Sequence, residues 1–163
     1  MKHLLLIAIV TIACVSAFGQ TAKVSPNDLK RVEGAIWTGS LTYLDYGSGK
    51  KTSIASQLMV SRSESGSWKF EILYPDEPKA NKSYVAKLSS DRKTFDDERV
   101  VERKKLPGGV LKVVTETKGS DDDKPATFRH TYLISKTAFS IRKEVKFDGG
   151  TEFFERNIYA WRR

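Results

Sequence analysis

The sequence contains little of the chemistry from which most active sites are built. Among its 163 residues are one cysteine, Cys14, and two histidines, His3 and His130. A single cysteine cannot form an intramolecular disulfide, and two histidines are too few for a metal site built on a histidine cluster. The Gly-x-Ser-x-Gly motif of a serine hydrolase does not occur either. We therefore expect a protein that is not an enzyme and that holds neither a metal nor a cofactor.

Long apolar runs are equally scarce. The run Leu4–Ala13 follows Lys2 and is too short for a transmembrane helix, but it has the length of a signal-peptide core. Residues 17–19, Ala-Phe-Gly, fit the small-x-small pattern of a signal-peptidase site, so we expect cleavage after Gly19. The alternative is a lipoprotein anchored through Cys14 in "TIAC". Both predict export, to a bacterial periplasm or to the cell exterior.

Removal of the signal peptide, residues 1–19, leaves residues 20–163, the size of one ordinary domain. It takes one of the 28 basic side chains and none of the 20 acidic ones, which leaves a net charge of +7. The basic stretches "ERKK" and "WRR" contain little aromatic interleaving, so binding to nucleic acid is not expected. The charge favours contact with an anionic surface of the cell envelope, and we expect a monomer.

After Gly34 the sequence alternates between apolar and polar residues with the period of a β-strand, interrupted by turn-forming segments at hairpin spacing. Only one short helix is predicted, beginning at Pro26 behind the N-cap Ser25. We expect strands at 37–43, 54–60, 68–74, 84–88, 128–134, 139–147 and 153–161, with a further, unassigned strand in "FDDERVVE" (95–102). The pattern predicts an all-β, antiparallel up-and-down barrel of about eight to nine strands, because closure leaves no sheet edge exposed.

Four features recur in one known group of barrels. They are the short N-terminal helix, Trp37 early in the first strand ("GAIWTG"), the run of hairpins, and Arg162 and Arg163 at the end of the last strand. In this the chain resembles the calycin superfamily of lipocalin-like and fatty-acid-binding-protein-like barrels. In lipocalins an arginine near the last strand packs across the tryptophan and closes the base of the barrel. The resemblance implies a single lipocalin-like domain with a ligand-holding lumen.

The turns predict which residues of the last three strands face each other. A tight turn at Lys136 and Thr137 sets Ile134 opposite Phe139, Tyr132 opposite Ile141, His130 opposite Lys143 and Phe128 opposite Val145. A two-residue loop at 149–150 then points Phe154, Arg156, Ile158 and Ala160 inward. A three-residue loop at 148–150 instead points Phe153, Glu155, Asn157, Tyr159 and Trp161 inward. Both registers remain open at this point.

In the first register, His130, Lys143 and Arg156 form one inward-facing row on an apolar wall. Burying such a row costs on the order of several kcal/mol unless an anion joins it, so we expect it to bind the anionic head of a ligand. The neighbouring wall would consist of Tyr132, Ile141 and Ile158.

Three alternative interpretations of this row are open. Glu155 or a carboxylate of "FDDERVVE" would neutralise it and leave a structural ion pair. His130 would be a hydrogen-bonded core residue, or Lys143 would extend past the rim of the barrel into water. The consecutive Asp121, Asp122 and Asp123 are expected at a solvated loop tip and not in a calcium loop.

Two functions of different classes fit these features. The first is an exported barrel that holds a small apolar molecule in its lumen, with an anionic head such as that of a lipid or fatty acid. The second is an interaction or structural protein of the cell envelope whose barrel is filled by its own side chains. Cavity size separates them, because an eight-stranded barrel is just wide enough either to be filled or to hold one small ligand.

Overall fold

The computed structural model describes residues 22–63 and 66–163. The predicted signal peptide, its cleavage site after Gly19 and the alternative lipidation site Cys14 lie outside these residues. Within the described residues, no helix has the length and apolar character needed to cross a membrane. The helices that the structure describes are α1 (Pro26–Leu29) and two 3-10 turns, η1 (Pro78–Ala80) and η2 (Pro107–Gly109).

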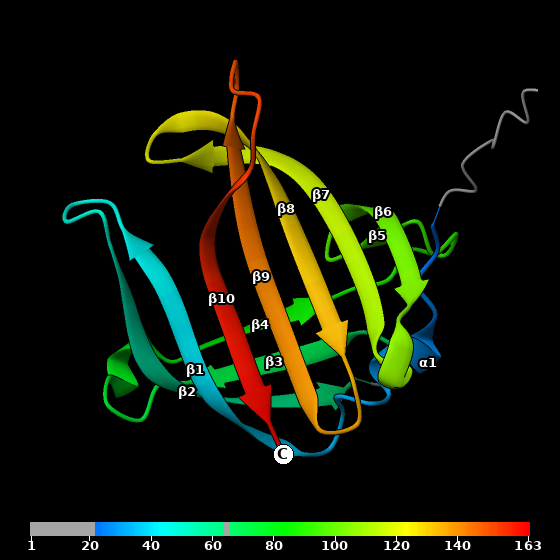
Figure 1. Ribbon diagram of the computed structural model, residues 1–163. Coiled ribbons are helices and arrows are strands. Elements are labelled where there is room, and N and C mark those ends of the chain that lie inside the picture. The colour runs from blue at the N-terminus through cyan, green and yellow to red at the C-terminus, as the bar shows by residue number, and fades with distance from the viewer. Residues whose placement is uncertain (1–21, 64–65) are drawn as a thin grey trace, which may run out of the picture.

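The strands form one ten-stranded antiparallel sheet that curls into a nearly closed barrel (Figure 1). They are β1 (Ile36–Asp45), β2 (Lys50–Arg62), β3 (Trp68–Leu73), β4 (Lys82–Ala86), β5 (Thr94–Phe95), β6 (Glu98–Lys105), β7 (Leu111–Asp121), β8 (Lys124–Ile134), β9 (Ala138–Phe147) and β10 (Phe154–Arg162). Their order across the sheet is β4-β3-β2-β1-β10-β9-β8-β7-β6-β5. The predicted all-β up-and-down barrel is therefore confirmed, with ten strands in place of eight to nine.

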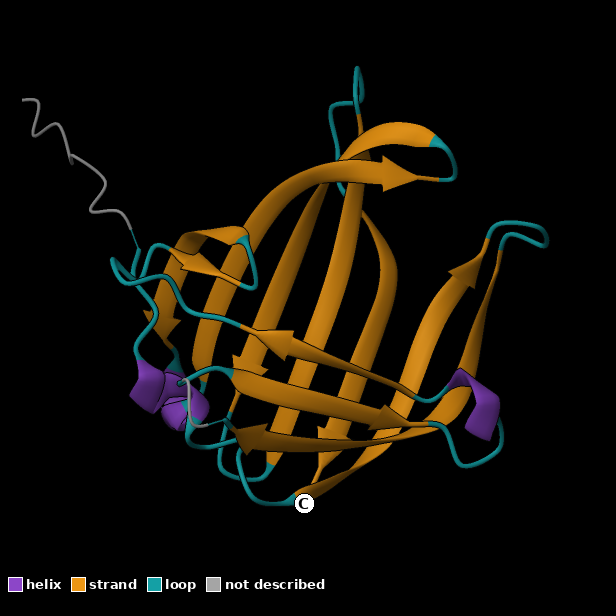
Figure 2. Ribbon diagram, turned by 180° about the vertical axis from the view of Figure 1, so that it is seen from behind, coloured by secondary structure: helices purple, strands orange, loops and turns teal. Residues whose placement is uncertain are grey.

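The two ends of the sheet meet where β4 leads into β5. Leu88 and Phe95 form an isolated bridge, and the Asp96 amide donates a hydrogen bond to the Lys87 carbonyl at 2.8 Å. Seen from the front and from behind, β3 and β4 run across β8, β9 and β10 at a steep angle on the opposite side of the barrel (Figures 1 and 2). The barrel thus has two crossed walls with the core between them.

Two strands were not assigned from the sequence: β5 as a strand separate from β6, and β7, for which no strand was predicted between residues 102 and 128. β5 covers only two residues, too few for a period to be visible. Around the three aspartates that we expected at a loop tip, the pairing of β7 with β8 continues as far as Asp121 and Lys124. The turn itself consists of Asp122 and Asp123, both in the left-handed region with φ of 50° and 58°. Aspartate adopts that conformation more readily than most residues, so this segment makes a two-residue hairpin turn.

The predicted short helix α1 is present and lies at one end of the barrel, which we call the closed end. The Ser25 amide donates to Asp28 Oδ2 at 2.7 Å as part of a capping box. Val32, just beyond the helix, is fully buried, and its carbonyl accepts a hydrogen bond from the Trp37 indole at 3.0 Å. The C-terminus and the β8–β9 turn lie at the same end (Figure 1).

Aromatic side chains fill the half of the barrel near the closed end. The largest fully buried ones are Trp37, Trp68, Trp161, Phe70, Phe95 and Phe139. Phe139 packs against both Trp37 and Trp161, with ring centroids 6.2 and 5.6 Å apart. The guanidinium of Arg163 lies 4.6 Å from the Trp37 ring centroid, the contact that the calycin resemblance predicts at the barrel base.

The register of β8 and β9 is the predicted one, including His130 opposite Lys143. The last strand follows neither predicted register throughout. Phe154 pairs with Val145 as the two-residue loop requires, but a β-bulge between Glu155 and Asn157 then shifts the pairing by one residue. Beyond the bulge Tyr159 and Trp161 are buried inside, as the three-residue loop requires. A bulge changes the parity of a strand, so each prediction was right for one half of β10.

Candidate functional site

A cavity of about 440 Å³ lies inside the barrel, on the side of the aromatic core away from the closed end. Its lining residues are Ile72, Lys82, Tyr84, Asp96, Glu98, His130, Tyr132, Ile141, Lys143, Asn157 and Tyr159. Tyr159 stacks on Trp161 with centroids 4.9 Å apart, so the floor of the cavity is the top of the aromatic core. The barrel is therefore filled in one half and hollow in the other.

Four of the six residues predicted to bind the ligand line this cavity. They are His130, Tyr132, Ile141 and Lys143. Ile158 does not, and its prediction was wrong: it pairs with Arg142 and so points to the outer face, because the bulge precedes it. Arg156 lies within the bulge itself, near Lys143 but outside the cavity lining. Of the predicted row, His130 and Lys143 therefore line the cavity, and Arg156 lies at the edge of the cavity.

His130 has an internal carboxylate partner. Its Nδ1 lies 2.9 Å from Oε2 of Glu98, and the Thr115 hydroxyl donates to the same oxygen. Thr115 is fully buried. Glu98 belongs to the "FDDERVVE" segment, so one of the two predicted competitors for the row is real. The carboxylate fixes the orientation of the imidazole and offsets its charge when the ring is protonated.

Asp121 neutralises the other two cations. Its carboxylate lies 3.8 Å from Lys143 Nζ and 3.5 Å from Arg156 Nε, and the hydroxyl of Tyr46 donates to it. The side chain of Asp121 is only 15% exposed, which corrects the prediction that it sits at a solvated tip. Arg156 also stacks over the Tyr46 ring at 4.1 Å and donates to the Leu44 carbonyl. These contacts tie the tip of the β1–β2 hairpin to that of the β7–β8 hairpin.

The other predicted competitor, Glu155, takes no part in the row. It points outward and pairs with Lys51 at 2.7 Å and with Arg142 at 3.1 Å. The three cations of the row therefore need no external anion to offset their desolvation, since Glu98 and Asp121 already do so. The argument for an anionic ligand cannot rest on unpaired charge in the row alone.

The sequence analysis missed Lys82, the cation of the cavity that has no carboxylate partner among the described residues. It opens β4 and extends over the Tyr159 ring, with Nζ 5.4 Å from the centroid. Across the cavity mouth, burial lowers the pKa of Lys143, and the nearby charges of Arg156 and Lys82 act in the same direction while Asp121 opposes them. Two lysines that line one cavity form a site where an anion is favourable.

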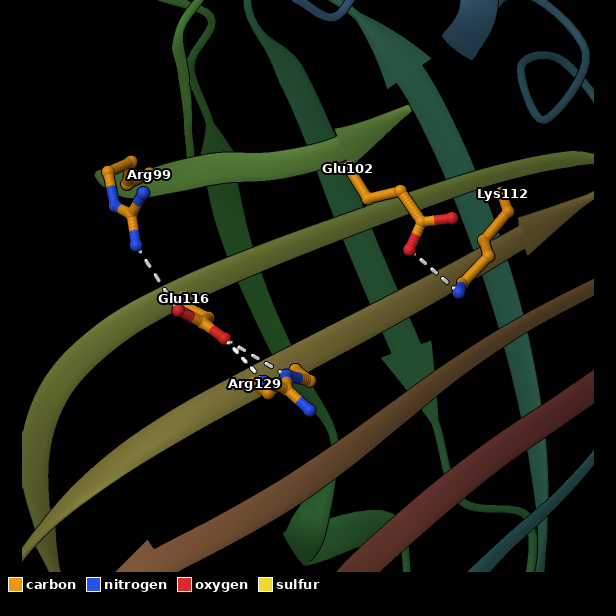
Figure 3. Close-up of polar contacts among 5 residues, drawn as sticks. All are labelled: Arg99, Glu102, Lys112, Glu116 and Arg129. Carbon is orange, nitrogen blue, oxygen red and sulfur yellow. Dashed lines mark hydrogen bonds and ion pairs between the residues drawn. The ribbon is translucent and has the colours of Figure 1, made fainter. Parts of the chain in front are cut away.

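The outer face of the barrel also carries ion pairs. Figure 3 shows Lys112 paired with Glu102 at 2.8 Å, and Glu116 held between Arg99 and Arg129 at 3.2 and 2.8 Å. These side chains come from β6, β7 and β8 and are partly exposed. Exposed pairs of this kind contribute about 0–1 kcal/mol each, so they keep the sheet surface polar more than they stabilise the fold.

Fold and cavity together define a class of protein: an all-β, nearly closed antiparallel barrel that is half filled and half hollow, compatible with a calycin-like fold. Comparison of the chain with protein-family models and with curated proteins finds no match. The function is therefore argued from the cavity and its side chains.

Proposed function

We propose that this protein is an exported, calycin-like binding protein that holds a small apolar molecule with an anionic group in its lumen, and that it is not an enzyme. The observation that carries the proposal is the cavity of about 440 Å³, with Lys82 and Lys143 on its lining. That volume is within the range of about 300–1,000 Å³ typical of small-molecule sites.

The lining divides into a wall for the apolar part and a site for the head group. Ile72, Ile141 and the faces of Tyr84 and Tyr159 supply apolar surface. Lys82 and Lys143 would contact the anion as point charges. Ammonium–carboxylate hydrogen bonds are shorter and stronger than neutral ones, which gives orientation to a ligand that is otherwise held by burial.

Dodecanoate is a suitable probe, with binding measured by isothermal titration calorimetry. Replacing Lys82 by Met should weaken binding about 5-fold, since one solvent-accessible charge contact is worth roughly 1 kcal/mol. The double variant K82M/K143M should weaken it by about 10- to 100-fold. Lys79→Met is the matched control, because Lys79 is exposed in η1 and does not line the cavity. Absence of dodecanoate binding to the wild type, or equal loss in the K79M control, would contradict the proposal.

A second candidate function is contact with an anionic surface of the cell envelope. Exposed basic side chains gather around the closed end, namely Lys30, Arg31, Lys104, Lys105, Lys136, Arg162 and Arg163. Two contacts hold the segments that carry them together: Arg31 donates to the Gly109 carbonyl at 2.7 Å and Arg163 to the Lys136 carbonyl at 2.8 Å. Co-sedimentation with anionic vesicles that disappears in the R162Q/R163Q variant would support this function, and it is compatible with an occupied lumen.

A further inference from the structure

The cavity has an acidic pole as well as a basic one. We define the acidic pole as Asp96, Glu98 and the hydroxyl of Tyr84, all of which line the cavity. Lys82 and Lys143 form the basic pole. A ligand with only an apolar body and an anionic head leaves the acidic pole without a function.

The polar groups at the acidic pole are not fully used by the fold. The Asp96 carboxylate makes no hydrogen bond or ion pair with another described residue. Tyr84 is partly buried, its ring stacks on Phe70 at 5.1 Å, and its hydroxyl makes no hydrogen bond to another described side chain. Glu98 uses Oε2 for both Thr115 and His130. These groups are partly exposed and line the cavity, so a ligand in the cavity can contact them.

Lys82 of the basic pole and Asp96 of the acidic pole lie far apart along the cavity, whereas the charge of Glu98 acts on the nearer Lys143. The Asp96 amide is hydrogen-bonded to the carbonyl of Lys87, and Lys82 precedes Lys87 by five residues along the same strand segment. At roughly 3.3 Å per residue, the backbones of Lys82 and Asp96 are about 16 Å apart. A single small group cannot contact both Lys82 and Asp96, whereas an extended ligand can.

We infer that the ligand is amphoteric: its anionic group binds Lys82 and Lys143, and a protonated amine at its other end binds Asp96 and Glu98. This inference rests on the proposed function and names the ligand class for the same cavity. The Tyr84 hydroxyl oxygen accepts a hydrogen bond from the same ammonium group. His130, on the other side of Glu98, is held by that carboxylate and leaves Asp96 as the group available to the amine.

The electrostatics of Asp96 favour a cationic partner. Burial raises the pKa of Asp96, and the neighbouring carboxylates Glu98 and Asp97 raise it further, with His130 opposing them. Like charges held close together in a partly buried site are relieved by a cation more than by any neutral group. An ammonium between Asp96 and Glu98 removes the repulsion that the chain alone leaves in place.

The test compares two probes of equal chain length, dodecanoate and 12-aminododecanoate, by calorimetry at pH 7, where the amine is protonated. An ammonium buried without a carboxylate partner would weaken binding more than about 100-fold. We expect 12-aminododecanoate to bind the wild type within about 10-fold of dodecanoate. In the Asp96→Asn variant it should weaken by at least about 10-fold, while dodecanoate binding stays the same or tightens.

Asp97→Asn is the matched control. Asp97 is exposed, does not line the cavity and shares the left-handed backbone of Asp96, with φ of 61° against 53°. Asparagine tolerates this conformation, so neither variant should disturb the fold. If dodecanoate binds but 12-aminododecanoate is rejected by the wild type, or D96N and D97N behave alike, the amphoteric ligand is refuted and the proposed function survives. If neither probe binds, the proposed function itself fails.

Discussion

Replacing Asp121 by Asn should tighten the binding of an anion in the lumen. Asp121 is the internal counter-charge of Lys143 and Arg156, at 3.8 and 3.5 Å. An anionic head that binds Lys143 must compete with it. Asparagine keeps the shape of the side chain and an oxygen that accepts the Tyr46 hydroxyl, but it removes the negative charge.

The expected gain follows from these distances. At an effective dielectric constant of about 20, each contact corresponds to roughly 4–5 kcal/mol of Coulomb energy. Both pairs lie at the rim of the barrel with partial exposure, and measured values for exposed pairs are about 0–1 kcal/mol. A net gain of about 1–2 kcal/mol is therefore reasonable, which is roughly 5- to 30-fold in the dissociation constant of dodecanoate.

Asp122→Asn provides the control, because Asp122 occupies the adjacent turn position in a left-handed conformation that asparagine also adopts. Its removal changes the net charge by the same amount without freeing Lys143. Calorimetric titration of wild type, D121N and D122N with dodecanoate at low and at physiological salt measures the effect. Equal affinities for D121N and D122N, or weaker binding by D121N, would refute the view that Asp121 competes with the ligand.

Two further predictions concern stability. A Cβ on Gly39 would lie 1.9 Å from the Ala160 carbonyl oxygen, so Gly39→Ala should cost about 3 kcal/mol or more by thermal unfolding; Gly47→Ala, with its nearest contact at 3.4 Å, should change little. Burial would raise the pKa of Asp28, but its hydrogen bonds from Arg103 and Ser25 outweigh this and hold it below 3.8. The stability that this lowered pKa contributes is fully present above the pKa of Asp28 in the unfolded chain and is lost as the pH falls through its pKa in the folded protein. The difference in the free energy of unfolding between wild type and Arg103→Met should therefore shrink between about pH 5 and pH 2. An advantage that is constant with pH would contradict the assignment.

The strand registers show where the sequence alone is enough to predict strand pairing and where it is not. In β8 and β9 the tight turn sets apolar residues opposite each other at nearly every position, so only one pairing is acceptable and it is the observed one. In β10 both parities mix apolar with polar residues. The bulge at Arg156 lets the strand use one parity at its start and the other at its end. Nothing in "FFERNIYAW" marks the bulge locally, because the tertiary burial of Tyr159 and Trp161 selects it.

The two charged residues that sequence reasoning misplaced or missed both stand at the edge of a segment that looked like a loop. Of three consecutive aspartates, the turn needs only Asp122 and Asp123, so Asp121 belongs to the strand and its side chain turns inward. Lys82 lies near the end of the turn-rich stretch "YPDEPKANKS" (74–83) and is the first residue of β4. A polar residue next to a turn is normally solvated. The curvature of the nearly closed sheet brings Lys82 to the cavity lining and Asp121 beside Lys143 at the rim.

The division of the barrel into a filled and a hollow half separates stability from binding. The aromatic core at the closed end lies below the cavity, so a change at Lys82, Asp96 or Asp121 removes no contact between the buried aromatic side chains. The internal ion pair between Asp121 and Lys143 also limits how tightly a ligand is held. Because Asp121 already neutralises Lys143, an incoming anion exchanges one partner for another and gains less than the full ion-pair energy. Under the proposed function, binding is therefore reversible and of moderate affinity, which suits a protein that takes up and releases its ligand and not one that stores it permanently.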